Sequence, residues 1–199
     1  MKKIFCLYLI CSFLLFFGGA ALAKDTLNLI KAKGTVNTAE IGGKGLYVFS
    51  MWDSSRNSFV SADGSFVTVV SDARTQKLSV RDDQKKTRAL AIALPQESGN
   101  IVFDAQSTAM AILFSDPSLF RNSADMEKLY KKAAEKKSFQ DLVIFLKKNL
   151  PSASLEELTG NGAYVALVRA CNKEIFNEDA FAVKKSLYEA REQLERLLQ

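Results

Sequence analysis

The sequence predicts an α+β fold in which strands come first and helices follow. From residue 27 to residue 103, short β-rich runs alternate with turn residues, which is typical of a small antiparallel β-sandwich or barrel. After Phe103 the apolar period becomes helical, and the first helical segment, Ala105 to Ser115, contains no charged residue. A helix that is apolar nearly all round is expected to be buried. We therefore expect this segment to give the sheets and the helical region one shared core.

The chain divides into a predicted signal peptide at 1–23, a β-sandwich-like region at 24–103 and a helical region at 104–199. Two lysines precede an apolar run and the small-residue motif Ala21-Leu22-Ala23, as in a secretory signal peptide. The run is shorter than the about 20 residues that a membrane span needs. Cleavage after Ala23 is therefore expected, with an uncleaved anchor as the alternative. We expect a periplasmic or secreted protein that is not an integral membrane protein once the signal is removed.

The residue composition excludes several kinds of chemistry. The formal net charge of +5 falls to +3 when Lys2 and Lys3 leave with the signal, and so small a bias does not indicate nucleic-acid binding. The chain has no histidine, which excludes Ser-His-Asp and Cys-His catalysis and removes the commonest ligand of zinc, copper and iron. Cys171 is the one cysteine of the mature chain; a buried inert thiol is expected, with redox chemistry or intermolecular pairing as the alternative. We expect no cofactor and no bound metal.

Three features set the expected layout of the β region. Asp63-Gly64 lies between two β-rich runs and predicts a tight hairpin turn. The stretch from Leu46 to Trp52 is apolar on both faces, which predicts a central strand. In a later strand, bulky residues alternate with alanines, so its small face lets another element approach closely. The bulky face carries Leu90, Ile92 and Leu94, and the small face carries Ala89, Ala91 and Ala93.

Ser107 and Thr108 lie where a strand-like stretch meets the buried helix. Such a place can hold a reactive serine on a sharp turn, but Ser107 has no flanking glycines and no histidine base. Met110 stands where a Ser-x-x-Lys catalyst would carry its lysine. Asp104 or Ser107 can instead cap the helix. We interpret Ser107 as a capping residue without a catalytic role.

Helix signals continue to the end of the chain. Helical stretches are expected after Ser123, Ser138 and Ser154 and near Ala163, each with a capping residue or a Gly or Pro break. The last helical stretch carries a continuous stripe of apolar residues, called the seam below, that must be buried. We expect it to dock onto the domain; a partner helix is the alternative, which makes Val183, Leu187, Leu194 and Leu197 a candidate partner surface. Ala180 and Ala190 complete the seam.

Oxygen-bearing residues give weak signals for metal binding or acid–base catalysis. Asp53, Asn57 and Asp63 do not follow the calcium-loop spacing, so turn formation explains them better. Adjacent acidic residues cannot face each other across a substrate as a glycosidase requires, and we interpret them as solvated turns or first-turn helix acids. A pair assembled from distant residues stays open. The adjacent pairs are Asp82-Asp83, Glu156-Glu157 and Glu178-Asp179.

Lys128, Lys131, Lys132 and Lys136 form a candidate basic patch. Lys128, Lys132 and Lys136 have the spacing of one helical stripe and could contact anionic lipid, cell-wall polymer or an acidic partner. The opposite side of the segment is apolar, so an ordinary solvated helix surface is the first expectation.

Gly34-Thr35-Val36, the apolar run from Leu46 to Phe49 and the stretch "SADGSFVTV" are the features through which the β region is similar to a known family. Residues 28–115 resemble the carboxypeptidase-regulatory-like, or prealbumin-like, sandwich family, and "STAMAIL" resembles a helix that follows such a sandwich in uncharacterised secreted proteins. The chain differs in its insertion between Val36 and Leu46 and in its helical second half. The resemblance implies a non-enzymatic accessory or interaction module without catalytic residues.

These observations predict an exported, non-enzymatic binding or structural accessory protein of the bacterial envelope that acts through a surface. Another envelope protein or a cell-wall polymer is the expected partner. The alternative is a carboxylate-dependent hydrolase or lyase acting on cell-envelope polymer, which needs a cleft with two inward carboxyls. A third hypothesis is a subunit of an envelope complex that docks through the terminal helix.

Overall fold

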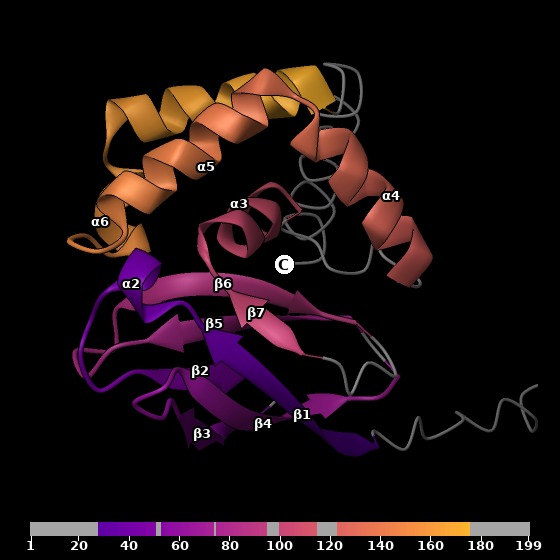
Figure 1. Ribbon diagram of the computed structural model, residues 1–199, viewed down its shortest axis with the longest axis vertical. Coiled ribbons are helices and arrows are strands. Elements are labelled where there is room, and N and C mark those ends of the chain that lie inside the picture. The colour runs from indigo at the N-terminus through magenta and orange to yellow at the C-terminus, as the bar shows by residue number, and fades with distance from the viewer. Residues whose placement is uncertain (1–27, 51–52, 74, 95–99, 115–122, 176–199) are drawn as a thin grey trace, which may run out of the picture.

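The computed structural model describes residues 28–50, 53–73, 75–94, 100–114 and 123–175. Apart from the short helix α2 (Thr38–Ile41), the helices follow the strands, so the predicted α+β organisation is confirmed. The long helices lie on one side of the sheets (Figure 1). None of the helices in the described ranges has the length and apolar character needed to cross a membrane.

The described strands form two sheets. The three-stranded sheet has the order β4-β1-β7 and the four-stranded sheet has the order β3-β2-β5-β6, and they do not close into a barrel. Their inward side chains form one apolar cluster, to which Ala32 and Phe66 contribute from the first sheet and Val48 and Leu78 from the second. The strands are β1 (Leu29–Val36), β2 (Tyr47–Ser50), β3 (Asp53–Phe59), β4 (Ser65–Ser71), β5 (Gln76–Arg81), β6 (Thr87–Ala93) and β7 (Ile101–Phe103).

One strand pair departs from the predicted antiparallel arrangement. β7 runs parallel to β1, with Thr35 opposite Val102. A tight hairpin can connect two neighbouring strands only when they run antiparallel. β7, however, reaches β1 after the chain has passed through the other sheet, and such a long connection can enter in either direction. The antiparallel prediction is wrong for this pair.

The predicted turn at Asp63-Gly64 is present, but it does not join two strands of one sheet. Gly64 has a φ of 84°, which glycine tolerates, and its N–H donates to Ser61 O. A Cβ at Gly64 would lie 2.5 Å from Val36 O, so glycine also permits the close approach to β1. The hairpin prediction is wrong because β4 pairs with β1, whereas β3 pairs with β2 in the other sheet.

Two strands of the four-stranded sheet behave as predicted. β2 lies between β3 and β5 and is therefore central. β6 has a small face and a bulky face, and each belongs to a different core. Ala89, Ala91 and Ala93 lie in the core between the sheets, whereas Leu90, Ile92 and Leu94 pack against the helical core.

Helix α3 (Ala105–Leu113) is the predicted buried helix. Ala105, Ala109 and Ala111 are fully buried. α3 lies between β6 and α5 (Lys137–Asn149) (Figure 1) and shares the helical core with Leu142 and Leu146 of α5. The sheets and the helices therefore meet through this helix, but their buried apolar side chains form two clusters rather than the single shared core that was predicted.

The remaining helices follow most of their sequence signals. α4 (Ser123–Ala134) begins at the predicted serine, and α6 (Leu155–Thr159) has Ser154 as its N-cap with a capping box to Glu157. A further helix occupies residues 162–175, where Asn161 Oδ1 accepts the Ala163 N–H. α2 was not predicted, and it lies within the insertion between Val36 and Leu46.

Candidate functional site

The joint between β7 and α3 is a helix cap. Asp104 Oδ1 accepts the Ser107 N–H at 2.6 Å, and Ser107 Oγ accepts the Asp104 N–H at 2.9 Å. This reciprocal pair is a capping box. The same hydroxyl lies 3.3 Å from Leu90 O, to which it can donate. The Ser107 hydroxyl thus contacts backbone groups of both Asp104 and Leu90, as the capping interpretation predicts.

Replacing Ser107 with alanine is expected to cost about 1 kcal/mol of stability, because the N–H of Asp104 at the helix start loses its acceptor, Ser107 Oγ. The free energy of unfolding, measured by urea denaturation, tests this expectation. Ser152→Ala, at an exposed serine, is the control and should change stability by less than about 0.5 kcal/mol. A Ser107→Ala protein as stable as the wild type would contradict the capping role.

The free edge of β6 is covered by side chains of two helices. Thr108, which is fully buried, accepts the Leu90 N–H through Oγ1 at 3.2 Å and lies 3.4 Å from Leu90 O. At the start of the strand, both carboxylate oxygens of Glu156 lie 3.1 Å from the Thr87 nitrogen and accept its N–H. Unpaired edge groups would otherwise invite pairing with another chain. α3 and α6 therefore close this edge.

Two carboxylates from distant parts of the chain meet at the N-terminus of α3. Glu40 Oε2 accepts the Ala105 N–H at 3.1 Å, beside the capping carboxylate of Asp104. Both negative charges complement the positive end of the helix dipole. Glu40 Oε1 also lies 3.3 Å from Lys147 Nζ, with which it forms an ion pair. Burial raises the pKa of the Tyr130 hydroxyl, and the negative charge of Asp104 raises it further. Because each carboxylate accepts a backbone N–H, the pair serves as a helix cap.

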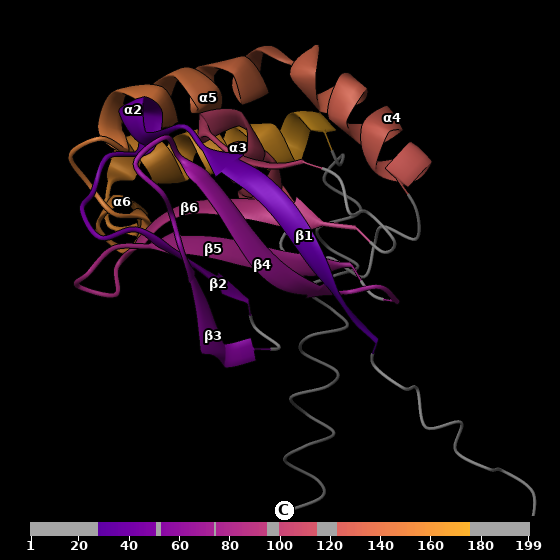
Figure 2. The same ribbon diagram turned by 60° about the horizontal axis from the view of Figure 1, so that its bottom comes forward.

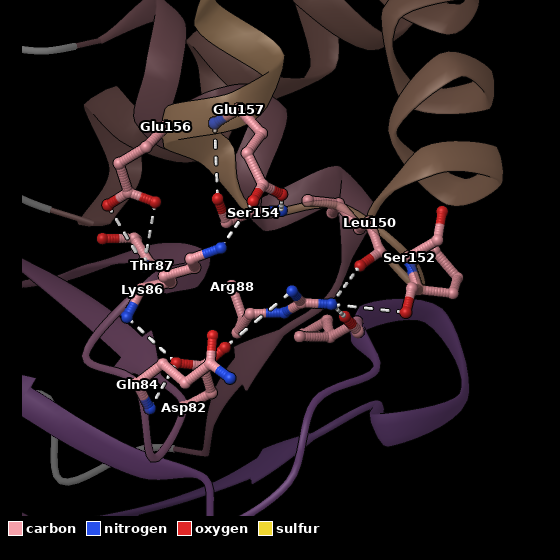
Figure 3. A network of polar contacts seen from close by, with 12 residues as sticks. Asp82, Gln84, Lys86, Thr87, Arg88, Leu150, Ser152, Ser154, Glu156 and Glu157 are labelled. Atoms are coloured by element: carbon pink, nitrogen blue, oxygen red, sulfur yellow. Dashed lines mark hydrogen bonds and ion pairs between the residues drawn. The ribbon is translucent and has the colours of Figure 1, made fainter.

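Arg88 joins the sheet, α2 and the end of α5 in a buried polar junction (Figure 3). Its Nη2 donates to Leu150 O at 2.8 Å and to Ile41 O and Pro151 O at 3.3 Å. Nη1 lies 3.9 Å from Asp82 Oδ2, and each of these two side chains is only 8% exposed. The last carbonyls of a helix have no intrahelical donor and carry partial negative charge. A buried cation satisfies them and fixes α5 to the sheet.

The adjacent acids Glu156 and Glu157 attach α6 to the start of β6 (Figure 3). Glu156 accepts the Thr87 N–H, and Glu157 Oε1 pairs with Lys86 Nζ at 2.5 Å. Their interpretation as first-turn helix acids is confirmed. Asp82, in contrast, is buried beside Arg88, so its interpretation as a solvated turn residue is wrong.

Acid is expected to weaken the contact between α6 and β6. Hydrogen bonds from the Lys86 ammonium and the Ser154 N–H lower the pKa of Glu157 from 4.5 to about 2. Burial acts to raise the pKa of Glu156, but its hydrogen bonds with Thr87 outweigh burial and lower it. A carboxyl whose folded pKa is depressed stabilises the fold above its unfolded pKa, and this contribution disappears as the pH falls through the folded value.

We therefore expect the Tm of the wild type to fall more steeply between pH 4.5 and about 2 than the Tm of Glu157→Gln. Thermal unfolding followed by circular dichroism at several pH values gives the comparison. Glu135→Gln changes an exposed glutamate after α4 and should keep the wild-type slope. Equal slopes for the wild type and Glu157→Gln would contradict the expectation.

The candidate basic patch is only partly assembled. Lys128, Lys131 and Lys132 are exposed on α4. Lys131 Nζ lies 2.8 Å from Glu127 Oε1, which neutralises part of the local charge. Lys136 occupies the N-cap position of α5, because α4 ends two residues before it. The predicted stripe through Lys136 is therefore wrong.

Cys171 is buried in the helical core, as predicted. Burial raises the pKa of its thiol, which disfavours the thiolate that redox chemistry needs. On the same helix, Glu174 Oε2 accepts the Ser138 hydroxyl at 2.6 Å and the Ser138 N–H at 3.2 Å. Ser138 was predicted to cap α5, but it lies inside the first turn and ties α5 to the helix at 162–175.

The other predicted sites are structural or lie outside the described residues. Asp63 Oδ1 accepts the N–H and the hydroxyl of Ser65, and these hydrogen bonds lower its pKa, so it is a turn residue. In the part of the chain that the structure describes, no three Cys, Asp or Glu residues are placed to hold a metal ion. Outside the described side chains lie Asp53, Asn57, the pair Glu178-Asp179, and the seam residues Val183, Leu187, Leu194 and Leu197.

None of the described helices lies over the outer face of the three-stranded sheet (Figure 2), and this face carries exposed apolar side chains. Val67, Leu29 and Val102 are 50%, 44% and 41% exposed. Lys31 and Lys33 lie on the same face of β1, and neither forms an ion pair with a described residue. The outward positions of these three strands carry no acidic residue. The sequence analysis recognised the strands but did not identify this surface.

Comparisons of the chain with protein-family models, curated proteins and solved structures find no match.

Proposed function

We propose that this chain is an exported, non-enzymatic binding or structural accessory protein of the bacterial envelope. The signal-like residues 1–23 support export to the periplasm or beyond. We further propose that the two sheets form a sandwich module of the carboxypeptidase-regulatory-like kind, which suits an interaction role. The capping roles of Asp104 and Ser107 support binding rather than catalysis, because both side chains already bond the backbone.

The binding surface in this proposal is the outer face of β4-β1-β7, and its partner is an anionic cell-wall polymer. One observation carries this choice: Lys31 and Lys33 stand between exposed apolar side chains on a face without acidic residues. Two lysines attract carboxylate or phosphate groups of a polymer. The neighbouring Val67 and Leu29 add apolar contact area that favours a bound state.

Co-sedimentation of residues 24–199 with purified cell-wall sacculi tests this function. We expect binding that weakens as salt rises to about 0.5 M. Lys31→Glu with Lys33→Glu should lower the affinity about tenfold or more, since both contacts become repulsive. Lys128→Glu with Lys132→Glu is the matched control and should stay within about twofold of the wild type. Absence of binding, or equal losses in the two double variants, would contradict the proposal.

The alternative is a carboxylate-dependent hydrolase or lyase, and Glu40 and Asp104, which meet at the start of α3, are the two carboxylates from distant parts of the chain that it would use. Release of soluble sugar from labelled sacculi distinguishes the two functions. The binding proposal predicts no release by the wild type. Release that Glu40→Gln abolishes would support the alternative.

A further inference from the structure

Asn161 and Gly162 are exposed residues at the start of the helix at 162–175. Asn161 is the only asparagine of the sequence that a glycine follows. Its Oδ1 caps the helix by accepting the Ala163 N–H at 2.9 Å and the Tyr164 N–H at 3.3 Å. Its side-chain nitrogen forms no hydrogen bond with a described residue. The fold therefore holds this surface amide by its oxygen alone.

The backbone nitrogen of Gly162 is the next atom of the chain that can react with this amide. The first N–H groups of a helix have no intrahelical acceptor, and the Gly162 N–H donates to none of the described residues. Among the described residues, no atom beyond its chain neighbours and its own helix backbone lies within 4 Å of a Cβ at Gly162. Neither a lost hydrogen bond of Gly162 nor a clash with these residues opposes movement of its nitrogen toward Asn161 Cγ.

The Asp63-Gly64 step shows the contrast. Gly64 is buried, and its N–H donates to Ser61 O at 2.9 Å. Asp63 Oδ1 accepts the N–H and the hydroxyl of Ser65. The fold thus fixes both the glycine nitrogen and the side-chain carbonyl group of this step, whereas the glycine nitrogen after Asn161 is fixed by no hydrogen bond to a described residue.

We propose that Asn161-Gly162 is a site of spontaneous covalent modification, at which water converts the Asn161 amide into a carboxylate. Hydroxide removes the Gly162 amide proton, and the nitrogen attacks Asn161 Cγ to form the new C–N bond of a cyclic imide. The Cγ–Nδ2 bond breaks, and Nδ2 leaves as ammonia with a proton from water, which regenerates hydroxide. Because the nucleophile and the electrophile are neighbours in one chain, the first step needs no second molecule to be oriented.

Water then opens the imide at either of its carbonyls. Addition at Cγ gives aspartate, which caps a helix about as well as asparagine and suits the positive end of the helix dipole. Addition at the main-chain carbonyl gives isoaspartate, in which the backbone continues through Cγ. Isoaspartate displaces the Asn161 carbonyl that accepts the Val165 N–H, so it weakens the start of the helix. This inference does not depend on the proposed function, because Lys31 and Lys33 take no part in it.

The helix cap slows this reaction only moderately. Rotation of the Asn161 side chain toward the Gly162 nitrogen breaks the hydrogen bonds of Oδ1 to Ala163 and Tyr164. Loss of a cap of this kind disfavours a conformation by about fivefold. We therefore expect the folded protein to react at a rate within about tenfold of the rate of the unfolded chain.

Peptide mapping by mass spectrometry tests the site. Residues 24–199 are incubated at mildly alkaline pH in water enriched in heavy oxygen, both folded and unfolded in urea. The peptide that contains Asn161 should gain the mass of an amide-to-acid conversion with heavy oxygen and should separate into two isomers. Every other asparagine precedes a residue with a Cβ and should react about tenfold more slowly or less.

Gly162→Ala is the matched control, and it should react about tenfold more slowly than the wild type because its Cβ hinders the approach of the nitrogen to Asn161 Cγ. Asn161→Asp should show no mass gain in this peptide, which assigns the change to residue 161. Circular dichroism verifies that both variants fold. A folded rate more than about a hundredfold below the unfolded rate exceeds the effect of a cap and would overturn the proposal. Equal rates for Gly162→Ala and the wild type, or equal conversion at another asparagine, would also overturn it.

Discussion

Arg88→Met is expected to lower the free energy of unfolding by about 3–5 kcal/mol, as removal of one partner from a buried ion pair does. Methionine fills the space of the aliphatic stem but cannot donate. The carbonyls of Leu150, Ile41 and Pro151 then lose their donor, and the buried Asp82 carboxylate loses its cation. Urea denaturation measures the loss.

Two further variants test the cause of the stability loss expected for Arg88→Met. Arg88→Lys retains the charge but lacks the planar fork, so it should be intermediate in stability. Asp82→Asn combined with Arg88→Met should cost less than the sum of the single changes, because the two groups share one buried contact. A loss below about 1 kcal/mol in Arg88→Met would mean that the junction contributes no more than an exposed pair.

Gly34→Ala is expected to destabilise the protein by about 3 kcal/mol, the upper part of the usual range for overpacking. Gly34 lies in β1 between β4 and β7. A Cβ there would overlap the carbonyl oxygen of Ile101 and the ring of Phe66. The ring can rotate, but the carbonyl belongs to the parallel β1–β7 ladder and cannot move without loss of that pairing.

Gly162→Ala is the matched control for Gly34→Ala. Among the described residues, no atom beyond its chain neighbours and its own helix backbone lies within 4 Å of a Cβ at Gly162, which begins the helix at 162–175. The change should be neutral or slightly stabilising, since alanine has the higher helix propensity. Adding Phe66→Leu to Gly34→Ala should recover only part of the stability. Full recovery would show that the ring alone, rather than the Ile101 carbonyl, excludes a side chain.

Features with a local cause were predictable from the sequence. The two faces of β6 follow from strict alternation of leucine or isoleucine with alanine. The start of α3 follows from Asp104 and Ser107, because a cap depends on residues three positions apart. The burial of α3 follows from its uncharged composition.

Features that depend on distant partners were not predictable. Glu40 reaches Ala105 only because α2 lies against the start of α3, and no local pattern connects them. Arg88 looks like a surface residue in the sequence until the end of α5 surrounds its guanidinium. The turn at Asp63-Gly64 has the chemistry of a hairpin, but the turn alone does not decide whether β4 pairs with β3 or with β1.

The account depends most on α3 as the buried link between the sheets and the helices, and native-state hydrogen exchange tests this directly. The amides of Ala109–Leu113 should exchange only through global unfolding, with the same free energy of opening as the amides of Leu78 and Val80 in central strand β5. Exchange of the α3 amides through a local opening of much lower free energy than that of β5 would contradict the account.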